Sequence, residues 1–251
     1  MNAYADRRAV IVGGTTGIGL ATAGALVAGG ARVLVTGRNE RNLAAAQRRL
    51  GSGALVVAAD ASSLDAIDEL AQRVEAQLGE VDLVFLNAAV ASLEPVAEVS
   101  ERSFDHIFDV NAKGSFFAAQ RLAPRVREGG SIVFTTVTNG TATPGMGVYM
   151  ASKAAVRALA QVLAAELLPR RIRVNTVAPG FIDTPTLGVA GMTEQERGAF
   201  REVGDEATPM GRHGTAEEVA RAVLFLAFDA TYTTGAELAV DGGLAQVDDP
   251  A

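Results

Sequence analysis

The chain has 251 residues, 49% of them hydrophobic and 20% charged, which is enough for a large α/β domain with a buried sheet. Its 22 basic and 29 acidic residues give a formal charge of −7, which argues against a nucleic-acid binder, because such proteins carry a basic face. The chain contains no cysteine and two histidines, so thiolate chemistry is excluded and a metal site is disfavoured. No segment approaches the roughly 18 consecutive apolar residues of a membrane span, and we expect a cytoplasmic protein without membrane contact.

Short apolar segments rich in β-branched residues alternate with stretches of helical periodicity along the chain. Strands that are apolar on both faces and separated by helices predict a parallel sheet covered on both sides. Because no linker, repeat or change of composition divides the chain, we predict one doubly wound, Rossmann-like α/β domain over residues 1–251, with a seven-stranded parallel sheet flanked by helices. The expected strands lie within 8–14, 31–37, 53–60, 81–88, 130–136, 172–179 and 235–243.

The first expected strand leads into a glycine-rich turn, "VGGTTGIG", followed by an Ala- and Leu-rich helix. Gly13, Gly17 and Gly19 stand where a side chain would block the phosphates of a ligand. The free N–H groups and the positive dipole end of the helix would attract a pyrophosphate. A glycine pattern between a strand and a helix is the context of a dinucleotide fingerprint, and a glycine-rich turn without a ligand is the alternative.

The end of the second expected strand bears on which dinucleotide binds. An NAD site has a carboxylate about 20 residues after the glycine turn, and this chain has Thr36-Gly37-Arg38 there. A guanidinium can pair with a 2′-phosphate through two parallel hydrogen bonds. The sequence therefore favours NADP(H). NAD(H) stays possible, since Arg38 near Glu40 can equally be a solvated residue at the start of a helix.

Several motifs, taken in chain order, resemble the short-chain dehydrogenase/reductase family. They are the Gly-x-x-x-Gly-x-Gly turn, Asn111, Tyr149-Met-Ala-Ser-Lys153 and "VAPGFIDTP", and the resemblance runs over nearly the whole chain. Two departures lie in cofactor-side turns. Val12 stands where the family usually has threonine, and Leu86-Asn87-Ala88-Ala89 replaces the usual Asn-Asn-Ala-Gly. These departures affect local hydrogen bonds and leave the catalytic motif intact.

Tyr149 and Lys153 are four residues apart in a helical pattern, so both side chains lie on one face of a helix. Hydride transfer to a carbonyl leaves an oxygen that needs a proton, and a tyrosine with an ordinary pKa of about 10 is a poor base near neutrality. A neighbouring ammonium favours the phenolate, so we expect Lys153 to lower the pKa of Tyr149 toward the range of efficient general acid/base catalysis.

The resemblance implies two further catalytic residues. Asn111 matches the family residue that supports a water chain from the lysine. Thr136, thirteen residues before Tyr149, matches the serine whose hydroxyl contacts the substrate oxygen. Threonine keeps that donor, so the site is expected to be competent with Thr136 as its polariser. Thr135 should point to the opposite face of the strand, and Thr138 is a weaker candidate for the same role.

The resemblance also implies a cofactor site at the strand ends. Asp60 would contact the adenine amino group, Asn87 would lie beside the ribose, and the backbone of Ile182 with the hydroxyl of Thr184 would hold the nicotinamide carboxamide. The full set is Gly13, Thr15, Thr16, Gly17, Ile18, Gly19, Arg38, Asp60, Ala61, Asn87, Ala88, Tyr149, Lys153, Pro179, Gly180, Ile182 and Thr184.

These observations predict an NADP-dependent oxidoreductase acting on a neutral carbonyl or alcohol, because the segment 138–148 carries no charge and the lid-like region 185–214 is rich in apolar residues. Arg197, Arg201 and Arg212 keep an anionic or carrier-bound 3-oxoacyl substrate open. A non-catalytic NAD(P)-binding regulator is a further alternative, whereas a dehalogenase-type lyase on this fold would lack Lys153 and the phosphate-binding glycines. The resemblance further implies a homotetramer formed through the helix 149–168 and "TTGAELAVDGG".

Overall fold

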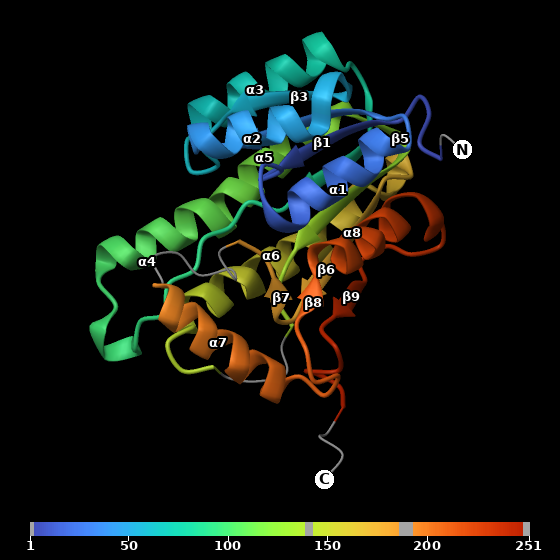
Figure 1. Cartoon of the computed structure of the whole chain (residues 1–251). Coiled ribbons are helices and arrows are strands. Elements are labelled where there is room, and N and C mark those ends of the chain that lie inside the picture. The colour runs from blue at the N-terminus through green and yellow to red at the C-terminus, as the bar shows by residue number, and fades with distance from the viewer. Residues whose placement is uncertain (1–2, 139–142, 186–192, 248–251) are drawn as a thin grey trace.

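The computed structural model describes residues 3–138, 143–185 and 193–247, which form a central sheet with helices on both faces (Figure 1). The sheet has seven parallel strands in the order β3-β2-β1-β4-β5-β6-β9. This confirms the predicted doubly wound α/β fold. The strands are β1 (Arg8–Val12), β2 (Arg32–Gly37), β3 (Ala54–Ala58), β4 (Val81–Leu86), β5 (Val126–Thr135), β6 (Arg173–Pro179) and β9 (Glu237–Val240).

Eight α-helices are described, and two short strands, β7 (Ile182–Asp183) and β8 (Gly214–Thr215), pair in parallel outside the main sheet. In Figure 1, α4 and α7 lie beyond one end of the sheet, while the other helices flank it. The helices are α1 (Gly17–Ala28), α2 (Glu40–Leu50), α3 (Leu64–Gln77), α4 (Glu101–Phe108), α5 (Gly114–Leu122), α6 (Gly147–Glu166), α7 (Glu194–Ala207) and α8 (Ala216–Leu224).

Alternate residues of each strand supply two separate cores. In β1, Val10 and Val12 pack with α3, α5 and α6, whereas Ala9 and Ile11 pack with α1 and α8 on the opposite face. All four are almost fully buried, which explains why the strands read as continuous apolar runs.

The strand order reverses at β1, which lies between β2 and β4. In open α/β sheets, ligands bind beyond the carboxyl ends of the strands at such a reversal. The glycine-rich turn after β1 and the residues that follow β4, β5 and β6 all lie at this end, so the topology brings together segments that are far apart in the sequence.

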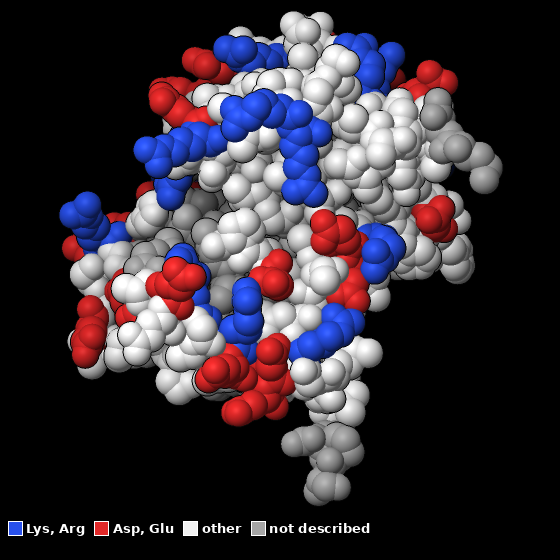
Figure 2. All heavy atoms as spheres, in the orientation of Figure 1, with Lys and Arg blue, Asp and Glu red and all other residues white. Residues whose placement is uncertain are grey.

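The surface carries charges of both signs. Figure 2 shows acidic and basic side chains interspersed over the lower part of the visible face, and a run of basic side chains over the region of α2. That helix carries the exposed residues Arg41, Arg48 and Arg49. Within the described residues, the structure contains no helix that is long and apolar enough to cross a membrane.

Candidate active site

The turn after β1 is packed so closely against the end of β4 that glycine is required. A Cβ on Gly13, whose φ is +82°, would lie 2.6 Å from the backbone of Ala88. A Cβ on Gly19 would lie 2.2 Å from the Gly13 carbonyl oxygen. Two of the three predicted glycines therefore serve the folding of the turn itself, as well as leaving room for a ligand.

The start of α1 is suited to an anion. Thr16, the residue at its N-cap, makes no side-chain hydrogen bond to the helix, and the first turn holds no acidic residue. By contrast, α2 and α3 begin with side chains that accept from backbone N–H groups, Asn39 from Asn42 and Ser63 from Ala66. The first N–H groups of α1 thus lack a side-chain cap, as a pyrophosphate site requires.

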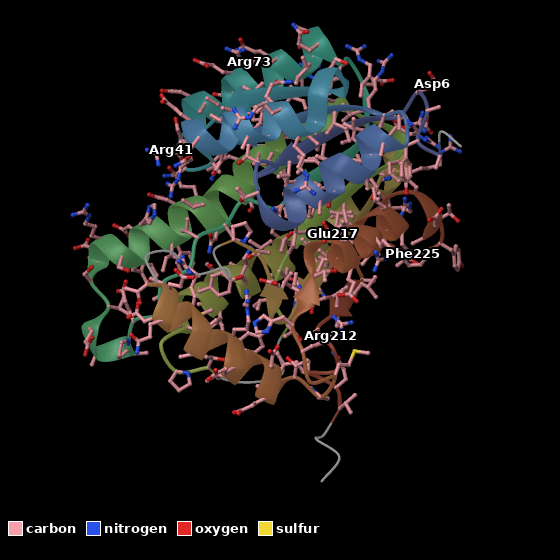
Figure 3. The ribbon with its side chains drawn as sticks, viewed as in Figure 1. Asp6, Arg41, Arg73, Arg212, Glu217 and Phe225 are labelled. Atoms are coloured by element: carbon pink, nitrogen blue, oxygen red, sulfur yellow. The ribbon has the colours of Figure 1, made fainter. Side chains whose placement is uncertain are left out.

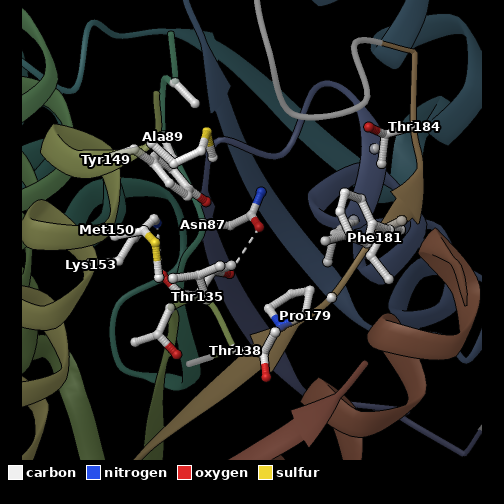
Figure 4. A pocket seen from close by; sticks show the side chains of 18 of the residues that line it. Asn87, Ala89, Thr135, Thr138, Tyr149, Met150, Lys153, Pro179, Phe181 and Thr184 are labelled. Carbon is white, nitrogen blue, oxygen red and sulfur yellow. Dashed lines mark hydrogen bonds between the residues drawn. The ribbon is translucent and has the colours of Figure 1, made fainter. Parts of the chain in front are cut away.

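Asn87 connects this turn to the end of β5. Its Nδ2 donates to the Gly13 carbonyl over 2.8 Å, and its Oδ1 accepts from the Thr135 hydroxyl over 2.9 Å. The orientation is fixed, because a carbonyl oxygen can only accept and the amide nitrogen must therefore face Gly13. Figure 4 shows the bond between Asn87 and Thr135 at the centre of the cavity.

Tyr149 and Lys153 come together as predicted, one turn apart in α6. Lys153 is 2% exposed, and its Nζ donates to the Thr135 carbonyl over 2.8 Å. The same nitrogen lies 5.9 Å from the centroid of the Tyr149 ring. In Figure 4 the two side chains occupy one side of the cavity, opposite Pro179, Phe181 and Thr184.

The electrostatics of this pair differ from the expectation. Burial raises the pKa of Tyr149 to about 12 and lowers the pKa of Lys153 to about 8, because desolvation disfavours the charged form of each group. The predicted lowering of the phenol pKa by the ammonium is therefore wrong for the site as described. The cost of burying a phenolate outweighs the attraction of a lysine whose own charge is disfavoured. Tyr149 consequently holds its proton at neutral pH.

Asn111 is fully buried in a π-helical turn, Asp109–Lys113, between α4 and α5. Its Nδ2 donates to the Val90 carbonyl over 2.9 Å and to the Ser152 hydroxyl over 3.0 Å, and its Oδ1 accepts from the Val90 N–H over 2.8 Å. Asn111 therefore joins the loop after β4 to α6. Single π-turns inside helices are frequent at functional sites. The role of Asn111 in a water chain stays a prediction.

The hydroxyl groups of two threonines after β5 donate hydrogen bonds to acceptors within the protein. Thr136 donates to Glu237 Oε2 over 2.8 Å, with the Val177 carbonyl at 3.2 Å, and Thr138 donates to Asp241 Oδ2 over 2.7 Å. Thr136 is 2% exposed. Thr136 and Thr138 both line the cavity together with Tyr149, and the Thr136 hydroxyl donates here to a carboxylate on β9, so the role of Thr136 as the polariser of the substrate stays a prediction. Thr138 is engaged in the same way.

At the end of β2, Arg38 is exposed and makes no ion pair within the described residues. It lies close enough to Asp60 to act on that carboxyl group. Burial raises the pKa of Asp60, but hydrogen bonds from the backbone and hydroxyl of Ser62, together with the charge of Arg38, leave it below its ordinary value. Arg41 extends outward from the start of α2 nearby (Figure 3), so a second guanidinium lies in the region of Arg38, together with the carboxylates of Glu40 and Asp60.

Gly37, the last residue of β2, is in close contact with Thr15. A Cβ on Gly37 would lie 2.4 Å from the Thr15 hydroxyl oxygen, and Thr15 is only 7% exposed. The glycine-rich turn therefore limits what can stand at position 37. This contact was not expected from the sequence, which gave no sign that the two positions touch.

The cavity has a volume of about 260 Å³, and Lys153 is the one charged residue among its described lining residues. Ten of the predicted cofactor residues line it, namely Thr16, Gly17, Ile18, Asn87, Tyr149, Lys153, Pro179, Gly180, Ile182 and Thr184. The others are adjacent in the turns or lie farther out, as Arg38 and Asp60 do.

Part of the cavity wall was missed from the sequence. Met146, Met150, Phe181, Phe200 and Leu244 add apolar surface to it. Phe181 belongs to the segment "VAPGFIDTP" after β6, and Met146 belongs to the uncharged segment before Tyr149. Their positions in these segments could have identified both as cavity residues. Leu244 follows β9 and had no signal. Residues 186–192 of the predicted lid lie outside the described residues.

A family model described as Enoyl-(Acyl carrier protein) reductase matches residues 12–245. The chain is 36% identical to galactitol 2-dehydrogenase (L-tagatose-forming) of Cereibacter sphaeroides, over 94% of this chain and 93% of that protein. It is 34% identical to the 3-oxoacyl-[acyl-carrier-protein] reductase FabG of Thermotoga maritima, over 94% of this chain and 96% of that protein. Among solved structures, a short-chain dehydrogenase/reductase from Serratia marcescens superposes with a TM-score of 0.88 at 29% identity, covering 97% of this chain and 99% of that one. With its glycine-rich turn and its Tyr149–Lys153 pair in the cavity, the chain belongs to the short-chain dehydrogenase/reductase family.

Proposed function

We propose that this oxidoreductase transfers hydride between NADP(H) and a neutral carbonyl or alcohol, with Tyr149 as the general acid/base. The observation that carries the proposal is the Tyr149–Lys153 pair in the wall of a cavity whose described lining has no other charge. Such surroundings favour neutral ligands, because the only charge in the described lining belongs to Lys153, which is buried and donates to the Thr135 carbonyl.

The chain's own residues can transfer a proton to and from the substrate oxygen. In the direction of reduction, the Tyr149 hydroxyl donates to the substrate oxygen as negative charge builds there, and the Lys153 ammonium stabilises the phenolate that results. In the direction of oxidation, Tyr149 must first lose its proton, and the resulting phenolate then accepts the proton of the alcohol. A bound nicotinamide would supply or take up the hydride. The Thr135 carbonyl holds the Lys153 ammonium in place over 2.8 Å.

The residues present fit a dinucleotide. The N–H groups at the start of α1 would bind the pyrophosphate, and the segment from Pro179 to Thr184 would border the nicotinamide. The exposed Arg38 guanidinium would pair with a 2′-phosphate. NADP(H) is therefore the proposed cofactor, and NAD(H) is the alternative.

A neutral substrate is favoured over an anionic or carrier-bound one by two ion pairs in the region 185–214. Arg201 pairs with Asp183 over 2.6 Å, and Arg212 pairs with Glu218 over 2.8 Å. Two of the three arginines that could meet an anion are therefore neutralised within the chain. The likeness to FabG keeps a carrier-bound 3-oxoacyl substrate as the second candidate, whereas the likeness to galactitol 2-dehydrogenase supports a neutral one.

We also propose that the protein is a homotetramer in the cytoplasm. The resemblance of α6 and β9 to the pairing elements of related members supports the assembly, and individual apolar side chains are exposed on the surface. Val162 of α6 is 55% exposed, and Phe225 after α8 is 48% exposed and extends outward in Figure 3. Light scattering at micromolar concentration tests the assembly, and a monomer there would contradict it.

The function is tested with a panel of neutral ketones, hydroxyketones and polyols, assayed by absorbance with NADPH and NADH, alongside acetoacetyl-carrier protein. We expect turnover of a neutral compound with NADPH, and its loss in Tyr149→Phe. Turnover of the carrier-bound substrate alone would favour the second candidate. Cofactor binding without turnover of any compound would indicate the non-catalytic regulator.

A further inference from the structure

A histidine lies behind the apolar wall of the cavity. His213, between α7 and β8, is 8% exposed. Its ring centroid lies 5.5 Å from that of Phe181, and the Phe181 ring meets the Phe200 ring edge-on at a centroid distance of 5.5 Å. Phe181 and Phe200 both line the cavity, whereas His213 is not among its described lining residues. The histidine therefore supports the wall from outside the cavity.

Asp205 of α7 fixes the orientation of the His213 ring. Its Oδ1 accepts from the backbone N–H of His213 and lies against the ring Nδ1, each over 2.6 Å. Because an ionised carboxylate can only accept, Nδ1 carries the proton and donates it to this carboxylate–imidazole pair. The ring Nε2 is buried and makes no hydrogen bond within the described residues. A phenyl ring would fill the same space without an unpaired polar atom, so the bond to Asp205 is what a histidine adds here.

The helix α7 fits closely against this ring. Phe200 and Gly204 are four residues apart in α7, so they lie on one face of the helix. A Cβ on Gly204 would lie 2.5 Å from Cε1 of His213 and 2.8 Å from Cδ1 of Phe181. The histidine ring thus occupies the space that a side chain at position 204 would need. A displacement of the ring would therefore disturb both aromatic residues of the wall.

The carboxylate–imidazole pair links α7 to the backbone that carries Phe181. His213 directly precedes Gly214, whose N–H donates to the Phe181 carbonyl over 2.9 Å at the start of the β7–β8 pairing. A second link, the ion pair of Arg201 with Asp183, has side chains that are 50% and 55% exposed. Exposed ion pairs contribute little to stability, so the pair with the buried histidine is the stronger attachment of the helix.

We propose that Asp205 and His213 are positioning residues, which hold Phe181 and Phe200 against the apolar part of the substrate. They determine how well the site binds a large apolar group next to the carbonyl and leave the proton transfer by Tyr149 unchanged. Figure 4 shows Phe181 across the cavity from Tyr149, where such a group would lie. The inference rests on the proposed function, because it concerns the remainder of a neutral substrate.

The test compares two neutral ketones, butanone and acetophenone, with NADPH as the cofactor. In His213→Ala, we expect the KM for acetophenone to rise roughly 10- to 100-fold, the range of a lost apolar contact in a binding pocket. The KM for butanone, the KM for NADPH and both kcat values should stay within about threefold, because only ground-state binding of the apolar group is lost.

The ratio of the two kcat/KM values is the decisive quantity. It does not depend on the amount of folded enzyme, so a variant that is merely less stable cannot change it. An unchanged ratio in His213→Ala would overturn the proposal. A change confined to the KM for NADPH would also overturn it, since the pair would then act on the cofactor.

Variants of the carboxylate separate the hydrogen bond from the charge. Asp205→Ala should shift the ratio in the same direction by about fivefold or more, the effect of losing one hydrogen bond to a charged group. Asp205→Asn keeps an acceptor and should stay within about threefold of the wild type. Glu206→Ala is the matched control, because it removes the adjacent, exposed carboxylate of the same helix. A shift in Glu206→Ala as large as that in Asp205→Ala would contradict the proposal.

Gly204→Ala tests the same contact from the helix side. The added Cβ meets the His213 ring, so this variant should also shift the ratio. In the His213→Ala background Cε1 is absent, and Gly204→Ala should then have little further effect. Effects that multiply in the double variant would show that the two positions act independently, contrary to the proposal.

Hydrogen exchange provides a readout that does not depend on turnover. His213→Ala and Asp205→Ala should speed amide exchange in 181–183 and 194–207, and Glu206→Ala should not. Unchanged exchange in the first two variants would overturn the positioning role even in an active enzyme. A wild-type protein that turns over no compound would refute the proposed function, while the exchange experiment would still decide whether the pair holds α7 to Phe181.

Discussion

We expect the stability of the wild-type protein to rise between pH 8 and about pH 10. Replacing Lys153 with methionine should abolish this rise. Burial lowers the pKa of Lys153 from 10.5 to about 8. The unfolded chain therefore binds this proton more tightly than the folded protein, and stability rises with pH between the two values. Each pKa unit is worth about 1.4 kcal/mol, so the full difference corresponds to about 3 kcal/mol, most of it regained by about pH 10.

Few other groups titrate in this range. The sequence contains no cysteine, and Lys113 is the only other lysine. Tyr149 acts in the opposite direction, because its pKa is raised to about 12 and the unfolded chain loses that proton first, but its effect begins only above about pH 10. The change in stability between about pH 8 and about pH 10 is therefore due mainly to Lys153.

The measurement is urea unfolding followed by circular dichroism at several pH values, for the wild type, Lys153→Met and Lys113→Met. The slope of stability against pH is the quantity to compare, since methionine also leaves the Thr135 carbonyl without its partner. Lys113 is the control because its side chain is 46% exposed, and its variant should keep the rise. Parallel curves for the wild type and Lys153→Met would refute the assignment of a buried, destabilised charge.

Three further expectations concern other parts of the molecule. Tyr149→Phe should lower kcat by roughly 10²- to 10⁴-fold, with NADPH affinity measured by its fluorescence nearly unchanged; a mild loss would assign the proton transfer to another group. Gly37→Asp alone should lower the free energy of unfolding by about 1 to 3 kcal/mol, because the added Cβ meets Thr15. Adding Thr15→Gly should restore stability and shift the cofactor preference toward NADH in steady-state assays. Full stability of the single variant would contradict the contact between positions 37 and 15. Asp205 accepts a hydrogen bond from His213, which holds the pKa of Asp205 below its ordinary value of 3.8. The contribution of Asp205 to stability is therefore lost as the pH falls through the acid range. Asp205→Asn should flatten this acid limb in thermal unfolding, and an unchanged limb would count against the contact with His213.

The fold and the placement of Tyr149 beside Lys153 could be predicted from the sequence because both depend on local patterns. Apolar segments bounded by glycine and proline identified every strand of the main sheet, and a four-residue spacing placed Tyr149 and Lys153 on one face of a helix. The direction of the Thr136 proton could not be predicted, since its acceptor lies 101 residues further along the chain. The pKa of Tyr149 depends on burial by surrounding elements, which no local pattern records.

The uncapped start of α1 links folding to metabolite concentration. Of the described helices that begin from extended backbone, α1 alone lacks a side-chain cap, whereas α2, α3, α4, α7 and α8 each have one. A dinucleotide whose phosphates complete this helix binds the folded chain and not the unfolded one, so it adds RT ln(1 + [L]/Kd) to the free energy of unfolding. At 100 times the dissociation constant this amounts to about 2.7 kcal/mol. The lifetime of the protein in a cell would then follow the size of the nicotinamide pool, and depletion of that pool would expose the chain to proteolysis before it limited turnover.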